Sequence, residues 1–135
     1  MRVTVLVGAL LLVGLVGART FATDGHAVGP QRQWSIVNFP EPTQVGRAFL
    51  SGPYLIVHDE AKMARGEPCT TIYRWIPGKG PEEQVLSFMC IHSTQALAAQ
   101  TTLTVGWSSS LGLATLERYQ FAGDTDGHGV PRKAE

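Results

Sequence analysis

The chain has 135 residues and carries 11 basic and 11 acidic side chains, which give a formal net charge of zero. Nucleic acids and anionic membranes both favour a strong surplus of basic residues, so this balance argues against either as the main partner. The length fits a single small domain. The partner that we expect is therefore an unidentified protein or small ligand.

The chain opens with an apolar run. The uncharged segment Val3–Ala18 follows the basic residue Arg2, and small residues come after it. This arrangement is typical of a secretory signal peptide. We expect residues 1–22 to be this signal, with cleavage after Ala18 or Ala22. The mature protein is then secreted or periplasmic, with no stable membrane insertion. The alternative is a retained membrane anchor, although the run is shorter than the roughly 20 residues that span a bilayer.

The sequence after the signal divides into three parts. Residues 23–33 contain glycine and proline without periodicity, which predicts a flexible mature N-terminus. Residues 34–123 contain short runs of β-branched and aromatic residues separated by turn residues, which predicts an all-β domain. The expected architecture is a small antiparallel sandwich or barrel of about six to eight short strands. Residues 124–135 are polar and rich in turn residues, which predicts a flexible polar tail.

Several segments of the domain have the composition of β-strands, and the connections between them contain glycine, proline or serine. We expect a loop over Glu60–Pro68, because it contains Gly66 and Pro68. The alanine-rich segment Thr94–Gln100 is expected to form a short helix or a crossover. In chain order, the predicted strands are Trp34–Phe39, Gln44–Leu50, Tyr54–Asp59, Cys69–Ile76, Glu83–Ser93, Thr101–Ser108 and Leu113–Gly123.

The sequence PGKGP between two of these segments predicts a β-hairpin. If Lys79-Gly80 is the tip of the turn, Cys69 lies directly opposite Cys90, and Tyr73 lies opposite Leu86 on the same face. The β carbons of opposed residues lie about 4.5–5.5 Å apart, close to the roughly 3.5–4.5 Å of a disulfide. Paired cysteines in exported proteins normally form disulfides. We therefore expect a Cys69–Cys90 disulfide that stabilises the domain by roughly 3 kcal/mol.

A metal site is the alternative use of the same cysteines. Residues two apart on a strand share a face, so Cys90 and His92 point the same way. Cys69, Cys90 and His92, with His58 as a further ligand, would suit zinc, and the addition of a methionine thioether would suit copper. Two observations weigh against this site. Neither cysteine belongs to a C-x-x-C-type pair, and the thiols of exported proteins tend to oxidise.

The segment from His58 to Cys69 is the densest polar stretch inside the domain. Loops that a rigid β scaffold holds in place often carry binding residues. The alternative is an ordinary solvated connection between two strands. The candidate binding residues of this loop are His58, Asp59, Lys62, Met63, Arg65 and Glu67.

No catalytic motif is present in the sequence. The serines of Gly106–Gly112 do not form a nucleophile elbow, and the glycines of Ile76–Pro81 do not form a phosphate-binding loop. The tail has part of the ligand spacing of an EF-hand, but His128 takes one ligand position and Pro131 interrupts the loop. We therefore assign no catalytic residue, no calcium site and no cofactor apart from the copper or zinc of the alternative.

These observations favour a small exported, non-enzymatic binding or interaction domain that a Cys69–Cys90 disulfide stabilises, with its ligand unknown. The alternative is a periplasmic metal-binding protein that holds copper or zinc with Cys69, Cys90, His92 and His58. An enzyme is the third hypothesis, because catalytic side chains can converge in space without a sequence motif.

Overall fold

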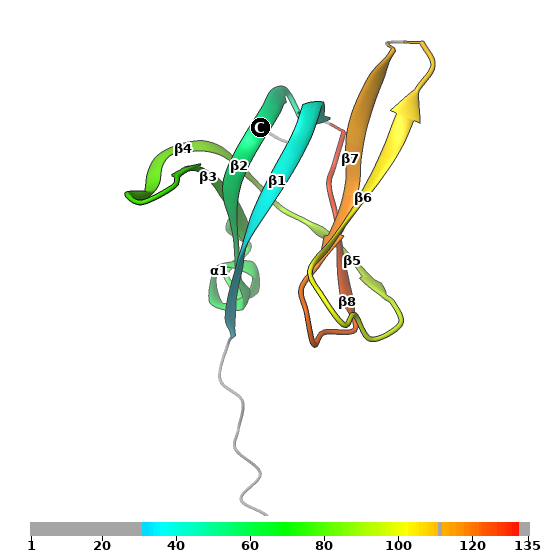
Figure 1. Cartoon of the computed structure of the whole chain (residues 1–135). Helices are drawn as coiled ribbons and strands as arrows, with labels where there is room; N and C mark the ends of the chain where they lie inside the picture. Colours follow the sequence, from blue (N-terminus) through cyan, green and yellow to red (C-terminus); the bar gives the residue numbers. More distant parts are fainter. Residues whose placement is uncertain (1–30, 111, 133–135) are drawn as a thin grey trace, which may run out of the picture.

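The computed structural model describes residues 31–110 and 112–132, and within them it contains one short helix and eight strands (Figure 1). All eight strands belong to a single sheet. The predicted all-β class and strand number are therefore confirmed. The sheet is not purely antiparallel as expected, because Thr43 and Gln44 pair in parallel with Ala114 and Thr115, and its sandwich or barrel arrangement stays a prediction. The signal peptide predicted over residues 1–22 lies outside the described residues. The elements are β1 (Arg32–Val45), β2 (Ala48–Asp59), α1 (Glu60–Ala64), β3 (Thr70–Ile76), β4 (Gly80–Phe88), β5 (Ile91–Thr94), β6 (Thr102–Ser108), β7 (Leu113–Gln120) and β8 (Asp126–Gly129).

Strands β1 and β2 form one long antiparallel hairpin. Its turn lies inside the segment Gln44–Leu50, for which the sequence predicts a single strand. Gly46 adopts a φ of 58°, a conformation that favours glycine, and Val45 pairs with Ala48 across the turn. β1 also continues past Pro40 and Pro42, because the register shift between Phe39 and Thr43 leaves the prolines outside the regular ladder.

Strands β3 and β4 form the predicted hairpin, but in a different register. Thr70 pairs with Phe88 and Ile72 with Leu86, and the ladder shifts twice before it reaches the turn. The predicted pairing of Tyr73 with Leu86 is therefore wrong. The reason is a turn centred earlier than expected, since Ile76 pairs with Gly80 rather than with Glu83, and the two register shifts then bring the ladder to within one residue of the predicted pairing. As a result, Ile72 rather than Tyr73 lies in the core.

The sheet divides at β7. Its strand order is β4-β3-β2-β1-β7-β8-β5, and β6 pairs along the length of β7. Because β6 occupies one edge of β7, β1 and β8 share the other edge. β1 pairs with it at Ala114 and Thr115, and β8 pairs with it from Arg118 to Gln120. The strands β1–β4 and β5–β8 thus form two halves of the sheet that diverge from this edge (Figure 1).

One hydrophobic core joins the two halves. A hydrogen bond between the buried hydroxyls of Thr70 on β3 and Tyr119 on β7 also connects them. Burying a large apolar side chain contributes about 1.5–3 kcal/mol to the free energy of folding. Burial in this shared core is therefore the main interaction that holds the two halves together. The core residues include Val37, Phe39, Tyr54, Ile56, Ile72, Leu86 and Phe88 from the first half, and Leu116 and Tyr119 from the second.

The C-terminal segment differs from the flexible polar tail that the sequence suggests for residues 124–135. Asp126–Gly129 forms β8, which pairs with both β5 and β7. Two glycines permit this close packing. A β carbon at Gly127 would lie 2.8 Å from a side-chain carbon of Arg118, and one at Gly129 would lie 3.1 Å from the carbonyl oxygen of Ile91. The side chain between these glycines is consequently buried.

The remaining connections are short or irregular. Residues 95–101 contain no helix, so the crossover is the correct alternative for this segment. The expected loop over Glu60–Pro68 instead begins with α1, because the Asp59 side chain accepts a hydrogen bond from the Lys62 backbone N–H and caps the helix. Within residues 31–110 and 112–132, no helix has the length and apolar character that crossing a membrane would require.

Candidate metal centre

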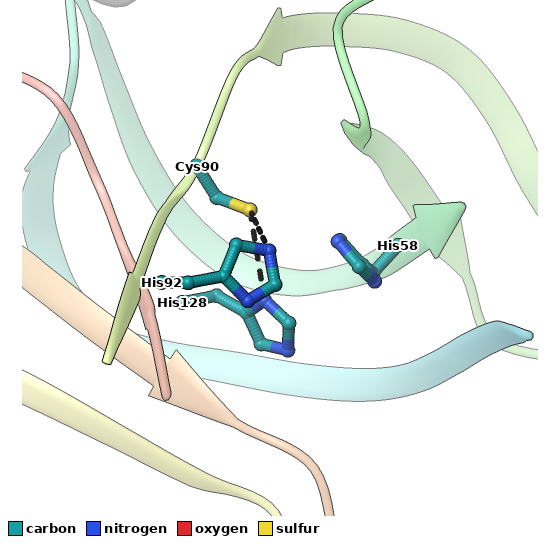
Figure 2. A group of neighbouring side chains, drawn as sticks. All are labelled: His58, Cys90, His92 and His128. Carbon is teal, nitrogen blue, oxygen red and sulfur yellow. Dashed lines mark hydrogen bonds between the residues drawn. The ribbon is translucent and has the colours of Figure 1, made fainter. Parts of the chain in front are cut away.

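Four side chains with metal-binding atoms converge where the two halves of the sheet meet. His58, Cys90, His92 and His128 each offer a nitrogen or sulfur atom, and these atoms all lie within 4.8 Å of one another (Figure 2). The side chains come from the end of β2, the residue before β5, β5 itself and β8. We call these four residues the His/Cys cluster.

The strand pattern explains why three of the four side chains meet. β5 and β8 are antiparallel, and their register places His92 directly opposite His128. Directly opposed residues project from the same face of a sheet. Cys90 precedes His92 by two residues, and its sulfur lies 3.6 Å from Nε2 of His92 and 3.6 Å from Nδ1 of His128 (Figure 2).

His58 approaches the cluster from the other half of the sheet. It follows Ile56 by two residues on β2 and so shares the core-facing side of that strand. Its side chain is 0% exposed, and neither ring nitrogen has a hydrogen-bond partner among the described residues. Burial and the nearby ring of His92 lower the pKa of His58 below its ordinary value. The ring is therefore neutral at physiological pH and keeps a free lone pair.

His128 lies equally deep. Its side chain is 1% exposed, its Nε2 has no partner among the described residues, and its ring stacks on Tyr119 with the ring centroids 4.9 Å apart. Burial, together with the rings of His58 and His92, lowers the pKa of His128 to about 4. Metal ions bind the neutral form of imidazole, so His128 can act as a ligand without first losing a proton near pH 7.

The structure does not contain the predicted Cys69–Cys90 disulfide. Both cysteines are free, and their sulfur atoms lie 3.2 Å apart, against about 2.05 Å for the bond. The register explains the difference from the predicted pairing, since Thr70 rather than Thr71 lies opposite Phe88. Cys69 is buried, and Cys90 is partly exposed beside the histidines. Burial and the neighbouring Cys69 raise the pKa of Cys90 to about 12. A bound cation would favour its thiolate form.

Met63 adds a soft sulfur at the outer side of the cluster. It lies on α1, and its sulfur is 2.8 Å from Nε2 of His92. The His92 side chain is exposed and Met63 is partly exposed, whereas His58 and His128 are buried. The cluster therefore has a closed inner side made by two histidines and an outer side that solvent can reach.

The remaining residues of the predicted binding loop do not join the cluster. Asp59 caps α1 through the backbone of Lys62. Arg65 and Glu67 form an exposed ion pair of 2.8 Å with each other. Of the six loop candidates, only His58 and Met63 lie at the cluster. From the alternative metal site, Cys90 and His92 lie there with them. Cys69 contacts the cluster through Cys90.

The distances in the cluster fit a metal ion. Two ligands of a tetrahedral zinc site with bonds of about 2.0–2.3 Å lie roughly 3.3–3.8 Å apart. The sulfur of Cys90 is 3.6 Å from a nitrogen of each of two histidines, inside this range. Centroid distances of 4.2–5.7 Å separate the three imidazole rings. The four ligand atoms lie within 4.8 Å of one another, so any pair separated by more than about 3.8 Å would have to close by up to about 1 Å for all four to bind one ion.

His128 is the member of the cluster that the sequence does not predict as a ligand. It lies in the predicted polar tail, because the surrounding residues are turn formers with no strand periodicity. The sequence does contain one indication that this histidine is buried, because Gly127 and Gly129 flank it. Glycines at alternate positions of a strand permit close approach of neighbouring chains, which can bury the side chain between them.

Comparison of this chain with protein-family models, with curated proteins and with solved structures gives no match. The residues of the His/Cys cluster and their geometry are therefore the basis for assigning a function.

Proposed function

We propose that this protein is a non-enzymatic metal-binding domain that holds one late first-row transition metal in the His/Cys cluster, and that the metal is copper in its reduced form. The observation that carries the proposal is the convergence of three imidazoles and a thiol within 4.8 Å. Two of these imidazoles are buried with ring nitrogens that have no partner among the described residues. Nitrogen and sulfur ligands in this combination are typical of copper and zinc sites.

The soft ligands favour copper over zinc. Thiolates and thioethers select Cu(I), and methionine is not among the usual ligands of zinc. Met63 places a thioether 2.8 Å from a ring nitrogen of His92, and the thiol of Cys69 lies 3.2 Å from that of Cys90, so two further soft sulfurs adjoin the cluster, although each must move away from its neighbour to share an ion with it. Zinc, bound by His58, Cys90, His92 and His128 alone, is the second candidate, which the 3.6 Å sulfur–nitrogen distances favour.

The proposal includes export from the cytoplasm. Its support is the apolar run Val3–Ala18 after Arg2 and the small residues that follow. In an oxidising compartment, a metal competes with disulfide formation for the thiols.

A metal titration tests the proposal and separates the two candidates. Reduced protein is titrated without oxygen with Cu(I) or Zn(II), each in competition with a chelator, and the stoichiometry is read by native mass spectrometry. We expect one metal per chain and tighter binding of Cu(I). The variant Met63→Leu should weaken Cu(I) binding and leave Zn(II) binding unchanged. Met89→Leu, which alters an exposed methionine beside Cys90, is the matched control and should change neither.

Two results would count against the proposal. If no metal binds with one-to-one stoichiometry, the metal-binding function is wrong. If Zn(II) binds and Met63→Leu affects both metals equally or neither, the choice of copper is wrong and zinc replaces it.

A further inference from the structure

Cys90 belongs to two groups of atoms at the same time. Its sulfur lies 3.6 Å from ring nitrogens of His92 and His128, as a metal ligand should, and 3.2 Å from the sulfur of Cys69. A cysteine binds a metal as a thiolate. A sulfur bonded to a second sulfur has lost that charge, so Cys90 cannot serve both partners at once.

We propose that Cys69 and Cys90 form a thiol–disulfide switch that controls metal binding in the His/Cys cluster. The inference rests on the proposed metal-binding function and adds its regulation. With both thiols reduced, Cys90 binds the metal beside the histidines. With the disulfide formed, the cluster keeps His58, His92 and His128 but loses its thiolate, and the metal is released.

The position of the cysteines in the chain favours such a change. Cys69 directly precedes β3 and Cys90 lies between β4 and β5, so both are outside the regular strands. Closing the sulfur–sulfur distance from 3.2 Å to a bond requires a movement of about 1 Å. Rotation of two side chains in irregular segments can supply this movement without breaking the ladder that pairs Thr70 with Phe88.

The oxidant that the reaction needs is a disulfide, either of a small thiol or of a protein. Cys90, the more accessible of the two cysteines, first loses its thiol proton to solvent. Its thiolate then attacks this disulfide, forms a mixed disulfide and releases one half of the oxidant as a thiolate that takes up a proton. The thiolate of Cys69 then attacks Cys90 and releases the second thiol. Two electrons pass from the cysteines to the oxidant, and the two protons leave on the released thiols. Reduction by a dithiol reverses both steps.

The test compares metal binding by the two redox forms of the mature protein. One sample is kept reduced, and the other is oxidised with glutathione disulfide and then freed of glutathione. A mass about 2 Da below the reduced chain, with no alkylatable thiol, identifies the bridged form. We expect the bridged form to bind Cu(I) at least about 100-fold more weakly, because it loses a direct ligand and the loss of a supporting group alone costs 10–100-fold. A dithiol should restore the affinity.

The variant Cys69→Ser is the matched control. It keeps Cys90 and the histidines but cannot form the bridge. After oxidation, the variant molecules that carry no bound glutathione should therefore bind Cu(I) with the same affinity as the reduced variant. Because Cys69 is buried, Cys69→Ala serves as the second variant if serine prevents folding.

The possible outcomes separate the switch from the metal site. Equal Cu(I) affinity of the reduced and bridged forms would overturn the switch and leave the metal-binding function intact. The same conclusion would follow if excess glutathione disulfide produced no bridge in the folded protein. Absence of metal binding by the reduced protein would overturn both proposals.

Discussion

Two imidazole rings, those of His58 and His128, lie in the interior with ring nitrogens that have no hydrogen-bond partner among the described residues. More than nine-tenths of buried polar groups in proteins have such a partner. Leaving one unsatisfied costs about 1–3 kcal/mol. A protein without a ligand for these nitrogens would gain stability from apolar residues at both positions. The proposed metal binding would explain why histidines occupy these positions despite this cost.

We expect the change His58→Leu to separate stability from binding. Leucine has a similar volume and no polar atom, so the free energy of unfolding of the metal-free protein should stay the same or rise by up to about 3 kcal/mol. Metal affinity should fall in the same variant, because a ligand is lost. Chemical denaturation with a chelator and a reductant measures the first quantity, and chelator competition measures the second.

Tyr119→Phe is a control that breaks a satisfied buried hydrogen bond, because it leaves the hydroxyl of Thr70 without its partner. It should lower the free energy of unfolding by about 1–2 kcal/mol. A loss of stability in His58→Leu larger than that of Tyr119→Phe would mean that the histidine has a structural role.

The buried histidines also predict how acid affects the metal-free protein. The pKa of His128 is lowered from its ordinary value of 6.5 to about 4, so between these values the unfolded chain binds more protons than the folded one. The free energy of unfolding should therefore fall as the pH falls from about 6.5 to about 4, by up to roughly 3 kcal/mol from His128. The pKa of His58 is also lowered and adds to the fall in the same direction.

Denaturation curves of metal-free protein at several pH values measure this effect, and His128→Gln should show a shallower dependence. An equally steep dependence in that variant would assign the acid sensitivity to other groups.

At the scale of single elements, β8 determines whether the cluster is complete. It carries His128 and places it opposite His92 on β5 and Tyr119 on β7. The strand fits between these neighbours because residues 127 and 129 have no side chains. The packing of one short strand therefore decides whether the buried side of the His/Cys cluster forms.

The change Gly127→Ala should disturb this strand. The added β carbon would lie 2.8 Å from side-chain atoms of Arg118 and Gln95 and 2.9 Å from the hydroxyl of Ser93, so moving one neighbour does not relieve the contact. Overpacking of this kind costs about 1–3 kcal/mol of unfolding free energy. Metal affinity should also fall, because His128 moves with the strand. Wild-type stability and affinity in Gly127→Ala would show that β8 can shift freely.

The elements also show what local sequence patterns can predict. The strand-like composition of Trp34–Phe39 and Tyr54–Asp59 correctly predicted parts of β1 and β2. The turn at Gly46 was missed because valine and phenylalanine on either side resemble one continuous strand. The register of β3 and β4 was wrong because a turn sequence does not reveal bulges further along the ladder. These errors have a common cause, since backbone details depend on packing that a local pattern does not contain.

At the scale of the whole molecule, the cluster exists because two halves of the sheet pack through one core. Its residues range from position 58 to position 128, and His58 reaches the other three from the opposite half. The sequence could predict that Cys90 and His92 share a face, because they are two residues apart in a segment with the composition of a strand. It could not predict that β8 returns beside β5, because that contact depends on the order of strands in the sheet.

The most direct test of the account is X-ray absorption at the metal edge of copper-loaded, reduced protein, together with His128→Gln and His92→Ala. We expect one copper per chain, with imidazole nitrogens and at least one sulfur bound directly to it, and loss of an imidazole contribution in each variant. A metal surrounded by oxygen ligands, or a spectrum that neither variant changes, would contradict the assignment of the His/Cys cluster as a metal centre.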